Sequence, residues 1–477
     1  MSGTKPKTDG GGGTFSHHER EGVGLLQELE QKRKQLQAEL EVESNGEFLR
    51  RESRDAKAEK QRRRRQRILF LLPLLFMAIL SAHSFGTYSP YGNELLAKLT
   101  QSMKGEQAES DEQQQHQPIL QEEEKEEGAA SEAQQQDDQQ QEQTQQQEEE
   151  ENVYSEAMTK EVKDSLAGLA ERVYVPNVID GTITVIDPTS FEIVDSFEVE
   201  ELPYHITPSW DMKELLVNNE ESSSFTVIDP TSGRPSGRVE ASFPYNFYYT
   251  PDGEKAVVVA ERLQLIGFRD RKTWELLGSV YIPWPGVDHL DFSKDGEYLL
   301  ASSEWSGVVS KIDVNKMELV DHVEVTGALP IDIKLSPDGK LFYVANQGSG
   351  GVSVIEPEEM EEIEFIPTGA GAHGLQVSRD AKSLYVSNRM EGSVSVIDLK
   401  SRKVVDKWYT GGSPDMFQIS PDGRQLWVSG RYDGAIYVLD TESGELLKTI
   451  YTGTQPHGLV YFPNPGRFSL GHNGVYR

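Results

Sequence analysis

The stretch LYVSNRMEGSVSVIDLKSRKVVDKWYTGGSPDMFQISPDGR, residues 384–424, contains the pattern that decides the fold. It begins with YVSN and SVSVID, two short runs in which β-branched and aromatic residues alternate with polar ones, as is typical of half-buried β-strands. It ends with SPDGR, whose Asp-Gly pair supplies the positive φ that a tight turn requires. The stretch therefore predicts short strands joined by tight turns, with no helical period.

Much of this unit recurs along the chain at a nearly constant period. Each copy contains four predicted strands, and an acidic residue ends the second strand of every copy. These acidic residues follow one another at intervals of 41 to 43 residues and are Asp187, Asp229, Asp270, Asp313, Glu356, Asp398 and Asp440. Seven four-stranded units of this length predict an all-β fold, the seven-bladed β-propeller. We interpret the strand-ending acidic residues as turn and packing residues.

The register of the repeat also predicts how the ring closes. The chain begins the repeat at RVYVPN, residues 172–177, which corresponds to a second strand, and it ends the repeat at HGLVYFP, residues 457–463, which corresponds to a first strand. One C-terminal strand should therefore complete the blade that three N-terminal strands begin, which removes the open sheet edges. The remaining tail, residues 467–477, has no place in the repeat, and we expect it either under the ring or toward the channel.

Three copies contain a short motif that resembles a known family. The motif reads YVPN at 174–177, YVAN at 343–346 and YVSN at 385–388, and each is followed by a strand ending in V-I-D or V-I-E. These repeats resemble the YVTN-type β-propeller repeat proteins, the YncE-like group, from Arg172 to about Pro463. The second, third and fourth copies depart from the motif, with LLVNN, VVVAE and LLASS in its place. The resemblance implies a seven-bladed propeller and does not imply one activity.

The composition limits the classes of function. The chain has 477 residues, no cysteine and a formal net charge of −32, which excludes disulfide frameworks and thiolate metal sites. Because phosphate backbones repel an acidic chain, we expect no binding to nucleic acid. Residues 105–151 hold seventeen of the acidic side chains and one lysine. This Gln/Glu-rich segment lacks the apolar residues that a hydrophobic core requires. That composition predicts a disordered tether.

The chain divides into five predicted segments before any blade is considered. They are a basic, partly helical cytoplasmic segment (1–67), a transmembrane signal-anchor (68–88), a Gln/Glu-rich extracytoplasmic linker (89–152), a short helix or linker (153–171), and the propeller with its C-terminal tail (172–477). Within the first segment, residues 22–43 place leucines at helical spacing for barely two heptads. This predicts at most a weak self-association.

The signal-anchor prediction rests on charge and length. Five arginines among residues 62–67 precede an apolar run at 68–82. Fifteen helical residues span about 22 Å, which is short of the roughly 30 Å bilayer core, but snorkelling arginines and the interfacial Phe85, Tyr88 and Tyr91 can supply the difference. The positive-inside rule then places the N-terminus in the cytoplasm and the propeller outside. The alternatives are a cleaved secretory signal, for which the leader is too long, and a soluble buried helix.

Candidate site residues follow from the loops that share one face of such a propeller. Loops that begin the innermost strands contribute Tyr204, His205, Tyr245, Asn246, Asp288, His289, Asp332, His373, Asp415 and His457 to the channel mouth. Loops between the second and third strands add Arg262, Glu304, Asn346, Arg389 and Arg431. We expect function to concentrate here, because a rigid scaffold carries variable loops at this face.

Three interpretations of this mouth remain open at the level of sequence. The first is a divalent metal ion bound by His373, His457 and His205, since imidazoles are suitable ligands. The second is a polar funnel whose His and Asp side chains bond to neighbouring blades and water. The third is an organic anion held by Arg389 and Arg431, which offer forked donors. Beyond this metal ion, the sequence names no cofactor.

Three functions compete as a result. We expect a membrane-tethered binding module that takes a small-molecule or protein ligand outside the cell. The second is a lactone-hydrolysing or cyclising enzyme, which the resemblance to other seven-bladed propellers implies, with His373 or His457 as base and Arg389 or Arg431 holding a carboxylate. The third is an inert structural protein of the cell envelope. The repeat region contains no nucleophile elbow, Walker loop or zinc-protease helix.

Overall fold

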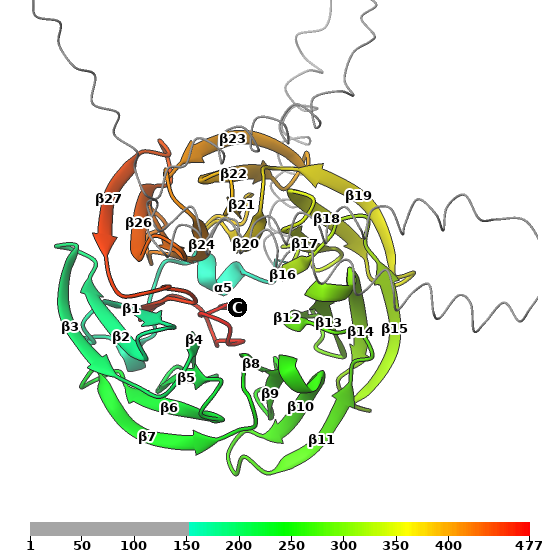
Figure 1. Ribbon diagram of the computed structural model, residues 1–477, viewed down its shortest axis with the longest axis horizontal. Coiled ribbons are helices and arrows are strands. Elements are labelled where there is room, and N and C mark those ends of the chain that lie inside the picture. Colours follow the sequence, from blue (N-terminus) through cyan, green and yellow to red (C-terminus); the bar gives the residue numbers. More distant parts are fainter. Residues whose placement is uncertain (1–151) are drawn as a thin grey trace, which may run out of the picture. The chain divides into compact units, whose positions relative to one another are not determined.

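Seven four-stranded antiparallel sheets, the blades, surround one axis in the computed structural model, which describes residues 152–477 (Figure 1). The predicted seven-bladed β-propeller is confirmed. Blade 1 comprises β1 (Arg172–Asn177), β2 (Thr182–Asp187), β3 (Glu192–Glu198) and the C-terminal β28 (Val460–Phe462). Blade 2 comprises β4 (Pro203–Pro208), β5 (Leu215–Asn219), β6 (Ser224–Asp229) and β7 (Arg234–Glu240). Blade 3 comprises β8 (Asn246–Tyr249), β9 (Lys255–Ala260), β10 (Leu265–Asp270) and β11 (Leu276–Tyr281).

The other four blades repeat the arrangement. They comprise β12 (Val287–Phe292), β13 (Tyr298–Ser303), β14 (Val308–Asp313) and β15 (Glu318–Glu324); β16 (Pro330–Leu335), β17 (Phe342–Asn346), β18 (Gly351–Glu356) and β19 (Glu361–Pro367); β20 (Ala372–Val377), β21 (Ser383–Asn388), β22 (Ser393–Asp398) and β23 (Lys403–Tyr409); β24 (Pro414–Ile419), β25 (Gln425–Gly430), β26 (Ala435–Asp440) and β27 (Leu446–Tyr451). Short 3-10 turns, η2 (Glu261–Leu263) and η3 (Glu304–Ser306), follow β9 and β13.

The ring closes as the register predicted. β28 pairs antiparallel with β1, with Tyr174 opposite Val460 and Arg172 opposite Phe462. The last strand of the repeat therefore supplies the innermost strand of blade 1, and both ends of the repeat are locked into one sheet.

Burial within each blade falls from the axis outward. The inner strands are mostly buried, although β10 of blade 3 is only partly so, whereas the outer strand, such as β3 or β7, is mostly exposed. The core lies between neighbouring blades, where Phe268 and Phe292 pack together from blades 3 and 4 at zero exposure. Burial of one such side chain contributes roughly 1.5–3 kcal/mol.

The strand-ending aspartates act as turn residues. The Asp187 carboxylate accepts the backbone N–H of Thr189 at 2.9 Å, and Asp229 accepts that of Thr231 at 2.8 Å. The same contact recurs at Asp270, Asp313, Asp398 and Asp440. Each carboxylate therefore holds the turn to the outer strand, which confirms the turn interpretation.

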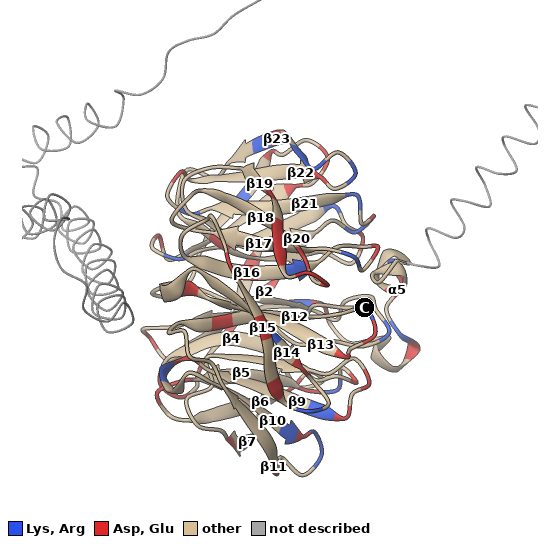
Figure 2. Ribbon diagram, turned by 90° about the vertical axis from the view of Figure 1, so that its right-hand side faces the viewer, with Lys and Arg blue, Asp and Glu red and all other residues tan. Residues whose placement is uncertain are grey.

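The face of the disc opposite the channel mouth carries both ends of the described chain. The helix α5 (Ser155–Met158) and the turn η1 (Asp164–Leu166) precede β1 there. Val153 N–H donates to the carbonyl of Pro337 at 2.8 Å, just after β16 ends. Figure 2 shows α5 and the C-terminus on the same side of the disc. The mouth is thus on the face away from the point where the described chain begins.

Residues 1–151 lie outside the described part of the chain. They include the predicted cytoplasmic segment with its 22–43 helix, the predicted membrane span and all but the last residue of the predicted linker. Within residues 152–477, no helix has the length and apolar character needed to cross a membrane.

Candidate functional site

The channel mouth has a rim formed by one structurally equivalent position of each blade. This position directly follows the second strand of the repeat unit, and in blades 2 to 7 it holds Glu220, Glu261, Glu304, Gln347, Arg389 and Arg431. We call these six residues the rim. Three successive blades contribute acids and the last two contribute arginines, so charge is separated across the mouth. Sequence reasoning missed Glu220 and Glu261, although Glu261 follows Glu220 by 41 residues and Glu304 follows Glu261 by 43, which is the period of the repeat.

The acidic side of the rim holds carboxyl groups that are costly to ionise. Burial, with the nearby charge of Asp288, raises the pKa of Glu261 to about 7. The same two causes raise the pKa of Glu304 well above its usual range. The negative charge of Glu220 is partly neutralised by Arg262, whose Nε lies 3.0 Å from Glu220 Oε1. Burial nevertheless raises the pKa of Glu220. Near neutral pH this side therefore carries less negative charge than its formula implies.

The basic side of the rim contains one anchored guanidinium and one with a single unpartnered nitrogen. Arg389 donates to Asp415 from Nε at 3.1 Å and from Nη2, and to Gln347 at 2.8 Å. Arg431 lies over the ring of Tyr204, 5.3 Å from its centroid. Its buried Nη1 has no hydrogen-bond partner within residues 152–477. Because a buried donor without a partner is destabilising, Arg431 is the group of the rim most ready to bind an anion.

Asp415 is the hub beneath the basic side. Its carboxylate contacts His373 Nδ1 at 2.9 Å and His457 Nδ1 at 2.6 Å in addition to Arg389. Burial would raise the pKa of Asp415, but Arg389 and the two histidines hold it well below its usual range. His373 is engaged at both ring nitrogens, since Arg389 Nη2 lies 2.5 Å from its Nε2, and burial lowers its pKa to about 4. The predicted polar network between neighbouring blades is present here.

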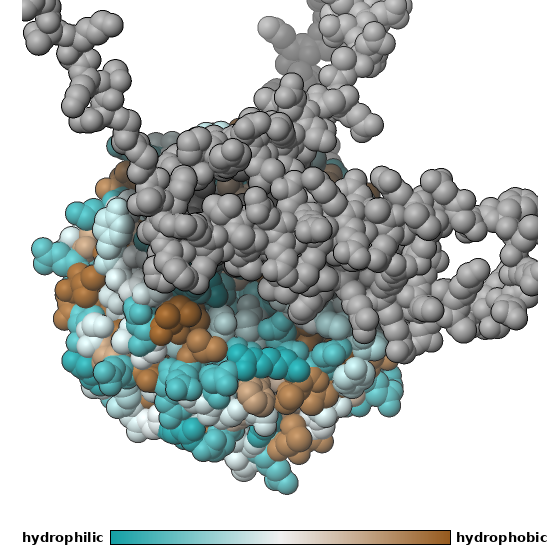
Figure 3. All heavy atoms as spheres, in the orientation of Figure 1, coloured by the Kyte–Doolittle hydropathy of each residue, from teal (hydrophilic) through white to brown (hydrophobic). Residues whose placement is uncertain are grey.

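Other predicted residues lie deeper or serve the scaffold. Asp332 accepts Lys334 Nζ at 2.8 Å and the backbone N–H of Leu375 at 2.9 Å, which ties blade 5 to blade 6. Asn346 donates to Ser353 within its own blade at 2.9 Å. The rings of Tyr204 and Tyr245 lie 5.1 Å apart at the mouth. Figure 3 shows hydrophilic and hydrophobic residues intermingled over the visible part of one face of the disc.

The C-terminal tail runs into the channel, which resolves the alternative that the sequence left open. Residues 468–477 are buried except for Val475, which is partly exposed, and they pair with the innermost strand of blade 3, where Tyr249 N–H donates to Leu470 and His472 N–H donates to Phe247. Arg477 Nη2 donates to Asp291 Oδ1 at 2.7 Å. The tail therefore closes the channel below the mouth, as its path to the centre of the ring shows (Figure 1).

The tail changes which histidines come together. His205 and His289 of the mouth loops meet His472 of the tail, with one imidazole nitrogen of each within 4.8 Å of the others. The predicted metal trio of His373, His457 and His205 is grouped differently, because the first two bond to Asp415. His472 carried no sequence signal, since it stands outside the repeat.

These features define a class, a seven-bladed β-propeller with a polar, charge-separated mouth and a channel closed by its own C-terminus. The sequence places it further: the chain belongs to the YNCE-like beta-propeller family, whose model matches residues 153–465. The resemblance inferred from the YVTN-type motifs is thereby confirmed. The comparison with curated proteins yields no match.

Solved structures of similar fold come from several bacteria. The periplasmic gluconolactonase PpgL of Pseudomonas aeruginosa is 21% identical, with a TM-score of 0.53 over 62% of this chain and 99% of that chain. A putative 6-phosphogluconolactonase from Bacteroides fragilis is 20% identical, with a TM-score of 0.52 over 62% and 98%. A functionally unknown protein from Desulfotomaculum acetoxidans is 17% identical, with a TM-score of 0.54 over 61% and 98%. At this identity the likeness shows the fold alone.

The raised pKa of Glu261 predicts a pH-dependent stability. Its ordinary pKa of 4.5 rises to about 7 on folding, so the folded chain binds more protons than the unfolded chain between those values. The contribution of Glu261 to stability is then greatest below pH 4.5 and falls as pH rises toward 7. Glu261→Gln should remove this part of the dependence, making the variant about 1–2 kcal/mol more stable than the native protein above pH 7, after allowance for partial exposure. Urea unfolding at pH 4.5, 6 and 8 measures it.

The surrounding charges set the control for that measurement. Asp288, Glu220 and Arg262 act on Glu261, and Trp305 Nε1 donates to its Oε1 at 2.7 Å. Glu254→Gln, an exposed carboxylate in a turn, should leave the pH profile unchanged. An equal gain for both variants at pH 8 would contradict the assignment to Glu261.

Proposed function

We propose that this propeller is a binding module whose mouth takes a small amphoteric molecule. The anionic group of the ligand, a carboxylate or phosphate, binds at the basic side of the rim, and its ammonium or hydroxyl groups face the acidic side. The observation that carries the proposal is the buried Nη1 of Arg431, one nitrogen of a forked donor, which has no hydrogen-bond partner within the described chain and belongs to the side of the rim opposite three acids. A guanidinium in that state gains charge-assisted hydrogen bonds when an anion arrives.

The charge separation selects among small ligands. Arg389 and Arg431 both lower the pKa of Glu304, so the two sides of the rim act on each other across the mouth. A simple anion would satisfy Arg431 but would leave the acidic side unmatched. A ligand with both an acidic and a basic or hydroxyl end, such as an amino acid, an amino sugar or a sugar acid, complements both sides.

The arrangement of His373 favours binding over catalysis by that residue. A general base needs a free lone pair within reach of the proton that it abstracts. His373 has one nitrogen beside the Arg389 guanidinium and the other beside Asp415. Its proton-accepting nitrogen is therefore already occupied by a donor.

Lactone hydrolysis is the second candidate function, and one contact favours it. His457 Nδ1 lies 2.6 Å from Asp415, the pairing that orients an imidazole for proton transfer. Two of the similar structures carry gluconolactonase names. In this alternative His457 acts as the base, and Arg431 holds the carboxylate or phosphate of a sugar lactone.

The placement of the protein in the cell is part of the proposal. The arginine cluster before the apolar run supports an uncleaved anchor with the propeller outside the membrane. The described chain begins on the face opposite the mouth. Protease added to intact cells should digest the propeller and spare the first 67 residues; full protection of both would refute this placement.

A thermal-shift panel tests the ligand class. Amino acids, amino sugars, sugar acids, simple carboxylates and polyamines are each added in excess to the full-length protein. An amphoteric ligand at 100 times its Kd should stabilise the protein by about 2.7 kcal/mol. Arg431→Met should abolish the shift, because it removes the forked donor and keeps the apolar stem over Tyr204.

Two further measurements separate the alternatives. Arg234→Met removes an exposed arginine of β7 that pairs with Asp195, and it should respond to the ligand like the native protein. An undiminished shift in Arg431→Met would contradict the site. If the native protein consumes a sugar lactone and His457→Gln does not, the enzymatic alternative holds instead. If no compound changes the melting temperature and none is consumed, only a structural role is left.

A further inference from the structure

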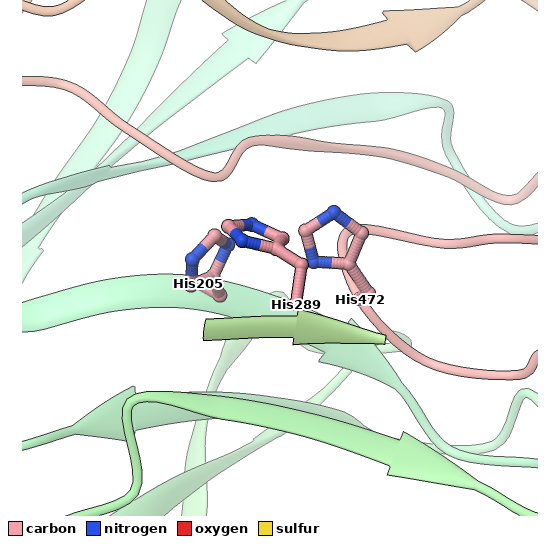
Figure 4. Close-up of side chains that lie close together, drawn as sticks. All are labelled: His205, His289 and His472. Carbon is pink, nitrogen blue, oxygen red and sulfur yellow. The ribbon is translucent and has the colours of Figure 1, made fainter. Parts of the chain in front are cut away.

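Three buried imidazoles face one another on the channel axis (Figure 4). His205 comes from β4, His289 from β12 and His472 from the C-terminal tail. One ring nitrogen of each lies within 4.8 Å of one nitrogen of each of the others. Ligands of a tetrahedral zinc ion, each about 2.0–2.1 Å from the metal, are roughly 3.3 Å apart. Side-chain shifts of the order of 1 Å would bring the three nitrogens to that spacing.

Two of the nitrogens lack any partner in the described chain. His205 Nε2 and His289 Nε2 are fully buried, and neither makes a hydrogen bond with residues 152–477. Both side chains have zero exposure. Buried polar atoms are normally satisfied, so two unpartnered imidazole nitrogens in one histidine cluster indicate a missing partner.

The other ring nitrogens of His205 and His289 each lie close to an oxygen atom of a neighbouring side chain. His205 Nδ1 lies 2.9 Å from Asn473 Oδ1, and His289 Nδ1 lies 2.7 Å from Asp288 Oδ1. Because an amide oxygen accepts a hydrogen bond, His205 Nδ1 carries the proton and its Nε2 presents a lone pair, whereas His289 Nδ1 makes no hydrogen bond within residues 152–477 despite its closeness to Asp288. Histidines that bind metals are oriented in this way by an oxygen at the second nitrogen.

The third imidazole, which the tail supplies, has neighbours at both of its ring nitrogens. His472 stacks on the ring of Tyr248, with centroids 5.5 Å apart, and Asn246 contacts its Nδ1 at 3.1 Å. Its Nε2 lies 3.5 Å from Asp332 Oδ1. The tail therefore supplies both a ring to the cluster and, through Asn473, the orienting group for His205.

We propose that His205, His289 and His472 bind one divalent transition-metal ion of the zinc class, which fastens the C-terminal tail in the channel. An all-imidazole set suits zinc, copper, nickel or iron and disfavours magnesium and calcium, which prefer oxygen. Three protein ligands leave a fourth position for water or a ligand atom. Tyr245 of the mouth contacts both His205 and His289, with ring centroids 5.8 and 6.3 Å away, so the ion lies next to the proposed binding mouth.

Metal content and affinity test the site directly. Full-length protein is purified without affinity metals, stripped with chelator and titrated with Zn²⁺ and with Co²⁺, whose visible absorption reports tetrahedral nitrogen coordination. The native protein should bind about one ion per chain. His289→Gln and His472→Gln, which keep the size and polarity of the side chain, should each weaken binding at least about 100-fold, because loss of a ligand exceeds the 10- to 100-fold effect of an outer partner.

Matched controls distinguish this site from other histidine pairs. His322→Gln alters a histidine of β15 that stacks on Trp284, and His373→Gln alters the Asp415 hub; both should bind the metal like the native protein. Metal loss in His373→Gln with retention in His289→Gln would overturn the proposal, as would a native protein that binds no ion at micromolar concentration. Circular dichroism of each variant confirms that it is folded.

Fastening of the tail gives a readout independent of coordination. Carboxypeptidase should remove C-terminal residues more slowly from the metal-loaded protein than from the stripped protein, and His472→Gln should abolish the difference. Equal digestion with and without Zn²⁺ would contradict the fastening role. These outcomes do not depend on the small-molecule panel, so the metal site and the proposed ligand class can fail separately.

Discussion

Truncation after Leu459 is expected to abolish the cooperative unfolding transition. It removes β28, the strand through which the end of the repeat pairs with β1, and leaves the inner edge of β1 unpaired. Blade 1 then has three strands and lacks its innermost one. Because ring closure removes every open inner edge, its loss affects the whole disc rather than one blade. Differential scanning calorimetry should show a broad transition or aggregation in place of one sharp peak.

A shorter truncation provides the control for ring closure. Ending the chain after Gly466 keeps β28 and removes only residues 467–477. The disc should still fold, but it loses the burial of Phe468, which stacks on Trp210, and leaves the Asp291 carboxylate buried without Arg477. We expect a loss on the order of 5 kcal/mol. Equal stability of the two truncations would show that the strand does not close the ring.

Asp415→Ala is expected to be the most destabilising single substitution at the mouth. Asp415 has zero exposure and is bonded to Arg389, His373 and His457. Its removal leaves the guanidinium of Arg389 in the interior without a counter-charge, and breaking a buried ion pair on one side costs about 3–5 kcal/mol. Denaturant unfolding at neutral pH measures the change in the free energy of unfolding.

Two variants calibrate that loss. Asp415→Asn keeps the shape and one acceptor, so it should cost less than Asp415→Ala. Asp195→Ala breaks an exposed pair with Arg234 on the outer surface, which should change stability by less than about 1 kcal/mol. If Asp195→Ala and Asp415→Ala had the same free energy of unfolding, the contacts of Asp415 would contribute no more to stability than an exposed ion pair does.

The fold could be predicted from sequence because its evidence is local and repeated. Alternation over runs such as YVSN, Asp-Gly turns and strand-ending aspartates each specify structure within a few residues, and seven copies reinforce the same assignment. The closing strand followed from the register alone. The mouth was also predicted in outline, because equivalent loops of a repeat must lie on the same face. The repeat positions of His205 and His289 assign both residues to this face, while the metal trio predicted from sequence was His373, His457 and His205.

The partners within the mouth could not be predicted in the same way. The repeat places Asp415, His373 and His457 near one another, but whether these histidines bond to the carboxylate or to a shared ion depends on distances of a few ångströms. Those distances follow from the packing of neighbouring blades. The same limit explains why Glu220 and Glu261 were missed: their importance appears only when the rim is seen with arginines opposite acids.

The sequence by itself determined the number of blades, the closing strand and the face that carries the mouth. Each of these depends on short local patterns and on a repeat unit that occurs seven times along the chain. Only the tertiary structure decided that the tail lies in the channel and brings His472 to His205 and His289. That meeting joins residues 267 and 183 positions apart through a segment outside the repeat. A contact of this kind leaves no periodic trace, because it is made by the path of one unrepeated segment through a space that the other blades create.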